Sequence, residues 1–188
     1  LTRPNANCTF QGIRLAQTWH DLALWETFLN RSSVRSIIEL GTWSGGMALF
    51  LGGQCRTRGL SMTSIDHDLS INECRSQLKE VGCRLIELDL LAESSASFMQ
   101  GLIDSLPKPT VLFCDNGNKP LEWNRYVPML EVGDFAAVHD WGSEFGPQNL
   151  DPRPDPFLKE EAEAIGSITR FFQVLRSNQT KTMPKLVQ

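Results

Sequence analysis

With 188 residues, the chain is long enough for one well-buried core and too short for two comfortable domains, so we expect a single domain over residues 1–188. The net charge of -4 argues against a nucleic-acid partner, because phosphate binding needs concentrated Lys and Arg. No apolar run approaches the roughly 18 residues of a membrane span, and the cysteines form no C-x-x-C pair, which disfavours zinc and favours a reducing, cytoplasmic compartment.

Hydrophobic periodicity divides the chain into alternating helices and strands. The first expected element is a helix over 17–29 inside a lead-in segment, 1–32, whose Trp19 and Trp25 suit either the core or the surface of a homo-oligomer. Strands are expected at 33–40, 60–66, 83–90, 110–115 and 134–140. Helices are expected at 47–59, 69–81, 95–106 and 119–131. The Pro- and Gly-rich segment 142–157 is expected to be a lid-like loop or poorly ordered, with a helix near 158–172 after it.

Strands that are separated by helix-length segments imply right-handed crossovers and a mainly parallel sheet with helices on both faces. The predicted fold class is therefore α/β, with a Rossmann-like, doubly wound sheet. Ligands of such sheets bind beyond the carboxyl ends of the strands. The residues at these strand ends are therefore the candidates for a functional site.

The first strand runs into a glycine-rich turn, GTWSGG. Gly41, Gly45 and Gly46 let the backbone approach a ligand closely and aim helix N-terminal N–H groups at anionic atoms. Glu39 lies just inside the end of the strand. The spacing is neither G-x-G-x-x-G nor a Walker loop, and a tight turn without a ligand is the alternative interpretation.

The second strand ends in SIDHD. An acid at the position of Asp66 can accept both hydroxyls of a ribose, which fits a nucleoside-containing cofactor. Asp68 is its rival, and His67 is expected at the surface. Asp89 ends the third strand and is a candidate for the adenine end of the cofactor, although acids also leave strands simply for solvent.

Asp115 and Asp140 end the fourth and fifth strands, in VLFCDNGNKPLEWN and AAVHDWG, so both carboxylates are expected at one edge of the sheet. Carboxylates with Asn or carbonyl oxygens suit a hard cation such as Mg²⁺ or Ca²⁺. His139 is expected to alternate to the other side of its strand. Lys119 suits a general base if burial or a nearby cation lowers its pKa. A solvated lysine beside an Asn-Gly turn is the alternative.

In this order, IIELGTWSGG, SID, FCDNGNKPLEWN and VGDFAAVHDW resemble class I S-adenosylmethionine (SAM)-dependent methyltransferases. More narrowly, they resemble the cephalosporin-hydroxylase-like and macrocin-type O-methyltransferase group. The stretch FQGIRLAQTWHDLALWETFL is similar to the lead-in helix of that group, in which a Gln and an Asp precede the first strand. The similarity covers roughly residues 10–142.

The resemblance implies SAM as the cofactor. Glu39, Gly41 and Gly45 would surround its methionine part, Asp66 would hold its ribose, and Asp89 would lie beside its adenine.

The resemblance also implies a divalent cation such as Mg²⁺, as an optional second cofactor, at Asp115 and Asp140. Asn116 matches a place where some relatives have a second acid and is the third metal candidate. Lys119 matches their basic residue. His139 and Asp140 stand where relatives often show Glu-Asp or Asp-Asn.

The implied activity is methyl transfer to a hydroxyl of a small molecule or sugar. Lys119 or His139 would take the proton, and Trp141 with the 142–157 loop would cover the acceptor. Two alternatives stay open. One is a non-catalytic cofactor-binding or scaffold module of the same fold, and the other is an NAD(P)-dependent oxidoreductase, which the missing G-x-G-x-x-G disfavours.

Overall fold

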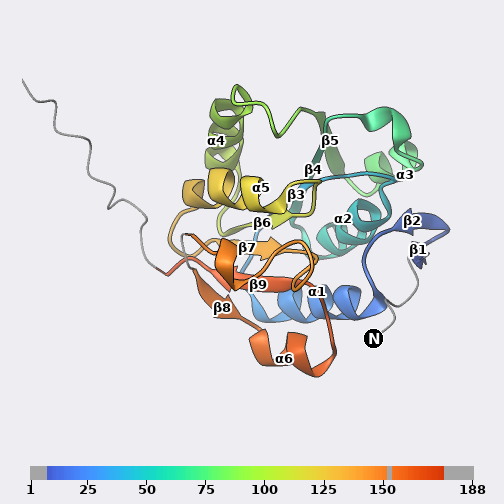
Figure 1. Cartoon of the computed structure of the whole chain (residues 1–188). Coiled ribbons are helices and arrows are strands. Elements are labelled where there is room, and N and C mark those ends of the chain that lie inside the picture. Colours follow the sequence, from blue (N-terminus) through green and yellow to red (C-terminus); the bar gives the residue numbers. More distant parts are fainter. Residues whose placement is uncertain (1–7, 152–153, 176–188) are drawn as a thin grey trace, which may run out of the picture.

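The computed structural model describes residues 8–151 and 154–175 (Figure 1). These residues build a seven-stranded sheet in the order β5-β4-β3-β6-β7-β9-β8, which confirms the Rossmann-like fold class. Five strands run parallel: β3 (Ser36–Leu40), β4 (Ser61–Asp66), β5 (Cys83–Glu87), β6 (Thr110–Cys114) and β7 (Phe135–Val138). Beyond β7 lie β9 (Arg170–Gln173) and β8 (Asp155–Phe157), and β9 is antiparallel to both of its neighbours.

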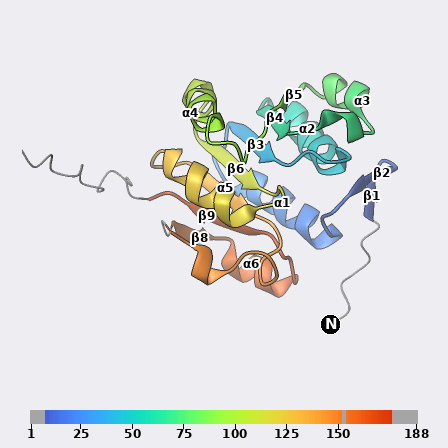
Figure 2. The same ribbon diagram turned by 45° about the horizontal axis from the view of Figure 1, so that its top comes forward.

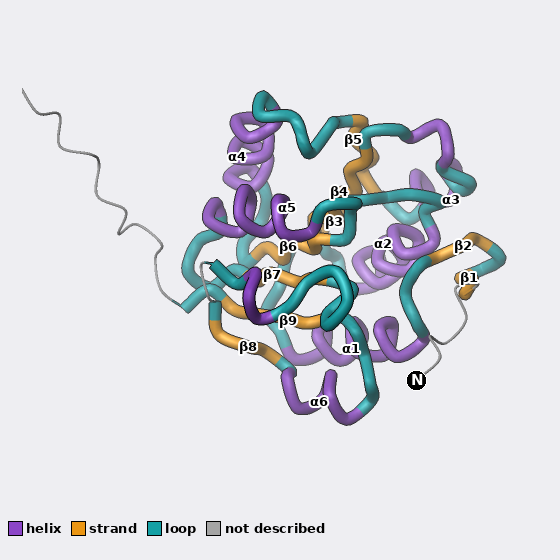
Figure 3. Tube along the Cα trace, in the orientation of Figure 1, coloured by secondary structure: helices purple, strands orange, loops and turns teal. Residues whose placement is uncertain are grey.

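Helices cover both faces of the sheet, as Figures 2 and 3 show. They are α1 (Trp19–Arg31), α2 (Gly46–Arg58), α3 (Arg75–Glu80), α4 (Ser95–Ser105), α5 (Lys119–Tyr126) and α6 (Lys159–Ala164). Alternate residues of one strand enter two different cores: Phe113 joins the core of α1 and α2, and Leu112 joins the core of α4 and α5. Burial on both sides explains why the parallel strands are almost wholly apolar. None of the described helices is long and apolar enough to cross a membrane.

The lead-in helix α1 begins with a reciprocal cap, in which Thr18 accepts from the N–H of Asp21 while Asp21 accepts from the N–H of Thr18. Its stripe buries Trp25 and Phe28 completely against the sheet. Trp19 leaves the stripe and is exposed. Of the two tryptophans, Trp25 therefore belongs to the core, and Trp19 stays available at the surface.

The helix expected near 158–172 is wrong in its second half. α6 ends at Ala164, Gly166 follows in the left-handed region (φ 66), and the chain then forms β9. Phe171 and Phe172 point into the two different cores, which is the period-two arrangement of a strand. Two adjacent buried aromatic residues satisfy a helical face as well as a buried strand, so periodicity alone did not separate them.

The segment 142–157 is more regular than the expected loop, because it contains a 3-10 turn at Pro147–Asn149 and the strand β8. Residues 152–153 of this segment, 1–7 of the lead-in segment and 176–188 lie outside the described residues.

A short hairpin before α1 was not anticipated. Its strands β1 (Cys8–Phe10) and β2 (Ile13–Leu15) are joined by Gln11 (φ 51) and Gly12 (φ 84). Positive φ at both turn residues is the geometry of a two-residue hairpin loop. The ring of Phe10 packs edge-on against Phe50 of α2, with 5.5 Å between ring centroids. The hairpin thereby places residues 14–17 beside the start of α2 (Figures 1 and 2).

Candidate active site

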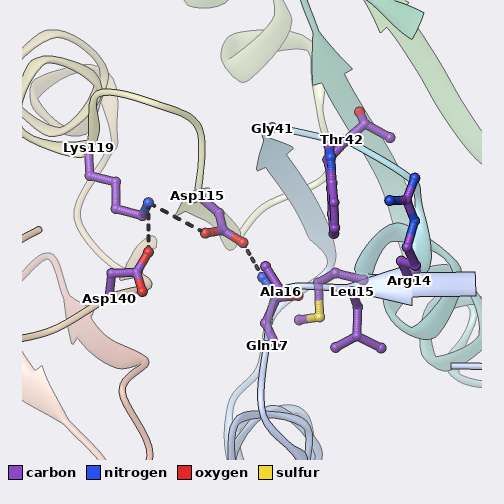
Figure 4. Close-up of a pocket in the computed structure, with 12 residues that line it drawn as sticks. Arg14, Leu15, Ala16, Gln17, Gly41, Thr42, Asp115, Lys119 and Asp140 are labelled. Carbon is purple, nitrogen blue, oxygen red and sulfur yellow. Dashed lines mark hydrogen bonds and ion pairs between the residues drawn. The ribbon is translucent and has the colours of Figure 1, made fainter. Parts of the chain in front are cut away.

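A cavity of about 160 Å³ lies at the carboxyl ends of β3 and β6 (Figure 4). One wall is the segment 14–17, and a second is the glycine turn with the first residues of α2. The third wall is formed by Asp115, Lys119 and Asp140. The cavity therefore joins four stretches of sequence that lie far apart in the chain: 14–17, 41–47, 115–119 and residue 140.

The glycine turn requires its glycines. Gly41 has φ 101, and a Cβ there would lie 2.7 Å from the carbonyl oxygen of Asp115. A Cβ on Gly46 would lie 2.3 Å from the carbonyl oxygen of Arg14. Any side chain at these positions would push apart the walls of the cavity. Gly45 begins α2 with φ 96, and a Cβ there would meet Asn72 and Cys74.

The two acids that sequence analysis assigned to the nucleoside lie outside the lining of the cavity. Asp66 is buried at the end of β4, and its carboxylate accepts from the N–H of Trp43 at 2.8 Å, which holds the glycine turn. His67 Nδ1 lies 3.0 Å from the other oxygen of Asp66. Asp89 is exposed beyond β5 and accepts from the N–H of Leu91. The ribose and adenine roles therefore stay predictions.

Glu39 is fully buried in β3 and accepts a hydrogen bond from the hydroxyl of Ser64. Burial, together with the charges of Asp115 and Asp66, raises the pKa of Glu39 well above its ordinary value. Its Oε1 atom has no hydrogen-bond partner among the described residues. Glu39 therefore offers an unpaired polar atom beside the glycine turn.

The third wall of the cavity is an acid–base cluster. Lys119 Nζ lies 3.0 Å from Asp140 Oδ2 and 3.8 Å from Asp115 Oδ1 (Figure 4). It also lies 2.9 Å from Glu144 Oε2. Burial alone would lower the pKa of Lys119, but the charge of Asp115 and the contacts with Glu144 and Asp140 outweigh it and raise the pKa above its ordinary value. In this arrangement Lys119 is an ammonium ion, contrary to the lowered pKa on which a ready general base would depend.

His139 also belongs to this cluster, although it lies outside the cavity lining. Its Nδ1 atom is 3.2 Å from Asp115 Oδ1 and 3.4 Å from Asp140 Oδ2, and its Nε2 atom is 3.6 Å from Asp21 Oδ2. The expectation that His139 alternates away from the acids is wrong. β7 ends at Val138, and Asp140 adopts φ 58, so strand alternation does not continue through these residues.

The cluster is electrostatically coupled. Burial would lower the pKa of His139, but Asp115, Asp140 and Asp21 together raise it well above its ordinary value. The hydrogen-bonding contact with His139 is the main cause that lowers the pKa of Asp140. Burial raises the pKa of Asp115 in spite of the same positive neighbours. The pKa of each of these groups therefore depends on whether its neighbours are charged.

Several residues of this network had no assigned role in the sequence analysis. Asp21 is fully buried and accepts from Ser167 Oγ at 2.6 Å and from the N–H groups of Ile168 and Thr169 at 3.0 Å. Gln17 donates to Asp115 Oδ2. Both lie in the stretch that carries the lead-in resemblance. Asp21 is a polar residue on the buried stripe of α1, and Gln17 is a buried polar residue just before that helix, so their polarity was the signal that could have marked them.

Hydrogen bonds from the backbone of the turn after β6 to a buried carboxylate also fix that turn. Glu122 is fully buried and accepts from the N–H groups of Asn116 and Asn118 at 3.3 and 3.2 Å. Asn118 caps α5 by accepting from the N–H of Leu121. The contacts described for Asn116 are those of its backbone, whose carbonyl oxygen accepts from Lys119 Nζ at 3.2 Å. A role of the Asn116 side chain in metal binding stays a prediction.

The fold is Rossmann-like, and solved SAM-dependent methyltransferases share it. The sequence matches no family model and no curated protein. Among solved structures, CmcI N160 with SAH aligns with a TM-score of 0.66 at 16% identity, over 88% of this chain and 81% of that one. CmcI D160 with Mg and SAM aligns with a TM-score of 0.60 at 20% identity, over 71% of this chain and 57% of that chain.

A third solved structure is MycE, a methyltransferase from the mycinamycin biosynthetic pathway, in complex with Mg, SAH and mycinamycin VI. It aligns with a TM-score of 0.53 at 15% identity, over 88% of this chain and 51% of that chain. At such identities these likenesses establish the shared fold and leave the activity to the chemistry of the site.

Proposed function

We propose that the chain is a SAM-dependent O-methyltransferase that acts on a hydroxyl of a small molecule or sugar with the help of a divalent cation. One observation carries the proposal. A single cavity has the glycine turn of β3 and α2 on one side and the cluster of Asp115, Lys119 and Asp140 on the other. A cofactor and an acceptor bound on these two sides would meet inside it.

The residues around the glycine turn fit the proposed cofactor. Gly41 and Gly46 allow the backbones of Asp115 and Arg14 to pack closely against the turn that lines the cavity, and Oε1 of Glu39 is a buried polar atom without a partner among the described residues. Gly45, Asp66 and Asp89 complete the proposed cofactor-binding set. SAM supplies an electrophilic methyl group when it is bound.

The cavity is small for this cofactor, since pockets for cofactors and drug-sized ligands usually have about 300–1,000 Å³. Its mouth is bordered by Arg14, whose guanidinium lies 5.1 Å from the centre of the Trp43 ring. Arg14 also pairs with Glu73. We infer that the segment 14–17 moves outward when the cofactor binds, and that its return excludes water.

The carboxylates of Asp115 and Asp140 would hold the cation, which lowers the pKa of the acceptor hydroxyl when it is bound. Gln17 fixes Asp115 from the opposite side. This donor set fits a divalent ion, because two carboxylates and an imidazole nitrogen converge.

Lys119 is the residue that we propose to handle the proton of the acceptor. Its Nζ atom lies at the cavity wall and contacts Glu144, whose side chain is 55% exposed. Because Lys119 is an ammonium ion in this arrangement, it would act as the base only if a bound cation took over the charges of Asp115 and Asp140, which would lower the pKa of Lys119. His139 does not line the cavity, so it is less well placed than Lys119 to take the proton of an acceptor.

Calorimetric titration with SAM, SAH and NAD⁺ tests the proposal, followed by methyl-transfer assays on a panel of hydroxylated acceptors. We expect SAM and SAH to bind and NAD⁺ not to bind. Binding of NAD⁺ instead would favour the oxidoreductase. Binding of SAM without transfer to any hydroxyl, with or without a divalent cation, would favour the scaffold module.

A further inference from the structure

We propose that the divalent cation of this site is a first-row transition metal rather than Mg²⁺, held by Asp115, Asp140 and the Nδ1 atom of His139, with Asp21 orienting the imidazole from behind. Only the catalytic use of the cation rests on the proposed function, that is, on methyl transfer. The binding itself is a separate property of these side chains and can be measured without turnover.

The spacing of the three side chains suits one ion. Two ligand atoms that are each about 2.1 Å from a metal lie roughly 3.0–3.4 Å apart at angles between square and tetrahedral. His139 Nδ1 is 3.2 Å from Asp115 Oδ1 and 3.4 Å from Asp140 Oδ2. All three ligand atoms lie within 4.8 Å of one another. Asp115 and Asp140 also line the cavity, so the remaining positions of an ion would face an acceptor.

His139 is the observation that points to a metal. Its side chain is 2% exposed, and its ring nitrogens face only carboxylates, at 3.2–3.6 Å. Within the part of the chain that the structure describes, none of these contacts has the geometry of a good hydrogen bond. Nδ1 faces two carboxylates, and one shared cation would satisfy all three side chains.

Asp21 completes the arrangement on the far side of the ring. Its Oδ2 atom lies 3.6 Å from His139 Nε2 and accepts from Thr18, while its Oδ1 atom is fixed by three donors from 167–169. A carboxylate beside the outer nitrogen of a histidine is the usual way in which a protein fixes a metal-bound imidazole. Asp21 is therefore a positioning residue, and Nδ1 is the nitrogen left for the ion.

The choice of metal follows from the nitrogen ligand. Mg²⁺ and Ca²⁺ prefer sites made of oxygen atoms alone, whereas imidazole suits first-row ions such as Fe²⁺, Co²⁺ and Zn²⁺. His139 puts a nitrogen atom in a set that would otherwise consist of oxygen atoms. The chain should therefore discriminate against Mg²⁺.

Lys119 competes with the ion for two of its ligands. Its Nζ atom lies 3.0 Å from Asp140 Oδ2 and 3.8 Å from Asp115 Oδ1, and it also pairs with Glu144 at 2.9 Å. A bound cation takes over the charges of Asp115 and Asp140 and leaves Lys119 with Glu144. In the competing arrangement, Lys119 and a protonated His139 are themselves the permanent counter-ions of Asp115 and Asp140, and no metal binds.

The test uses the full chain after treatment with a chelator and titrates it with Co²⁺, Zn²⁺, Mn²⁺ and Mg²⁺ by calorimetry. We expect one Co²⁺ or Zn²⁺ per chain, bound at least about 100-fold more tightly than Mg²⁺. His139→Gln should weaken Zn²⁺ binding by about 10–100-fold and change Mg²⁺ binding little. His20→Gln, at an exposed histidine, is the matched control and should bind like the parent.

The parent protein gives a second readout that needs no variant. The chain has three histidines, and His20 and His67 are both exposed. In ¹⁵N spectra of the imidazole side chains, Zn²⁺ should shift Nδ1 of His139 and leave those of His20 and His67 in place. Equal affinity for Mg²⁺ and Zn²⁺, or a His139 signal that Zn²⁺ does not change, overturns the proposal. SAM binding on the same samples reports separately on the proposed function.

Discussion

At the scale of single residues, the site depends on three residues whose position is fixed by close packing, backbone conformation or charge. Gly41 contacts the backbone of Asp115, Asp140 holds a left-handed conformation, and His139 lies between three acids. Each of them fixes a neighbour that lines the cavity. Substitutions there should therefore change stability and binding together.

Gly41→Ala is expected to lower the free energy of unfolding by about 2–4 kcal/mol, because its Cβ would lie 2.7 Å from the carbonyl oxygen of Asp115 at a φ of 101. It should also weaken SAH binding. Gly53→Ala in α2 is the matched control, since its Cβ would meet nothing within 4 Å, and it should be neutral or stabilise by up to about 1 kcal/mol. Urea unfolding measures both, and equal stabilities would contradict the close approach.

Glu39 should make stability fall as pH rises. Its folded-state pKa is raised, so the native state keeps a proton that the unfolded state loses above pH 4.5, the ordinary value. The contribution is complete below that value and is lost as pH rises towards the raised pKa. Glu39→Gln should therefore gain stability relative to the parent between pH 5 and 8, which urea unfolding with a chelator measures. A constant difference across this range would argue against a raised pKa.

At the scale of elements, the strand β9, next to β7, contributes side chains to both hydrophobic cores. Phe171 stacks on Phe28 with 4.2 Å between ring centroids, whereas Phe172 packs edge-on against Trp123 on the opposite face. The strand β9 thus joins helix α1 on one side to helix α5 on the other.

Phe171→Ala and Phe172→Ala should each cost about 3–5 kcal/mol, because each residue fills a different core. Since the two cores are separated by the sheet, the double variant should show nearly additive losses. Gln173→Ala is the control on the same strand and should cost less than about 1 kcal/mol. Thermal unfolding of the four variants and the parent checks this, and a Phe→Ala variant as stable as the parent would contradict the strand assignment.

The elements that could be predicted from the sequence are those with a clear local pattern of apolar residues. Five apolar runs became β3 to β7, and the acids at their ends brought Asp115 and Asp140 to one edge as expected. β9 was missed because Phe171 and Phe172 fit either period. The roles of Asp21 and Gln17 could not be derived, since their partners lie more than ninety residues away in the chain. The polarity of these two residues could have marked them, but it does not reveal which distant residues they contact.

At the scale of the whole molecule, the N-terminal hairpin closes one side of the cavity where it packs against α2. The segment 14–17 is part of the wall, and the cation–π pair of Arg14 and Trp43 borders the mouth. The hairpin is therefore both a structural cover of α2 and the proposed gate of the cavity.

Arg14→Ala should speed SAH association several-fold, because it removes the contacts with Trp43 and Glu73 that hold the mouth narrow. Stability should change by only about 0.5 kcal/mol, since the Arg14 side chain is 60% exposed. Stopped-flow tryptophan fluorescence measures the rate. Arg84→Ala, at an exposed arginine of β5, is the control, and an association rate equal to that of Arg14→Ala would exclude the gate.

The contacts of Asp21 have a consequence for synthesis. Its carboxylate, supplied early in the chain, receives three of its hydrogen bonds from residues 167–169. A nascent polypeptide on the ribosome cannot orient His139 correctly until those late residues have emerged from the exit tunnel. A chain that lacks residues 167–169 should therefore leave the Asp21 carboxylate without these three hydrogen bonds.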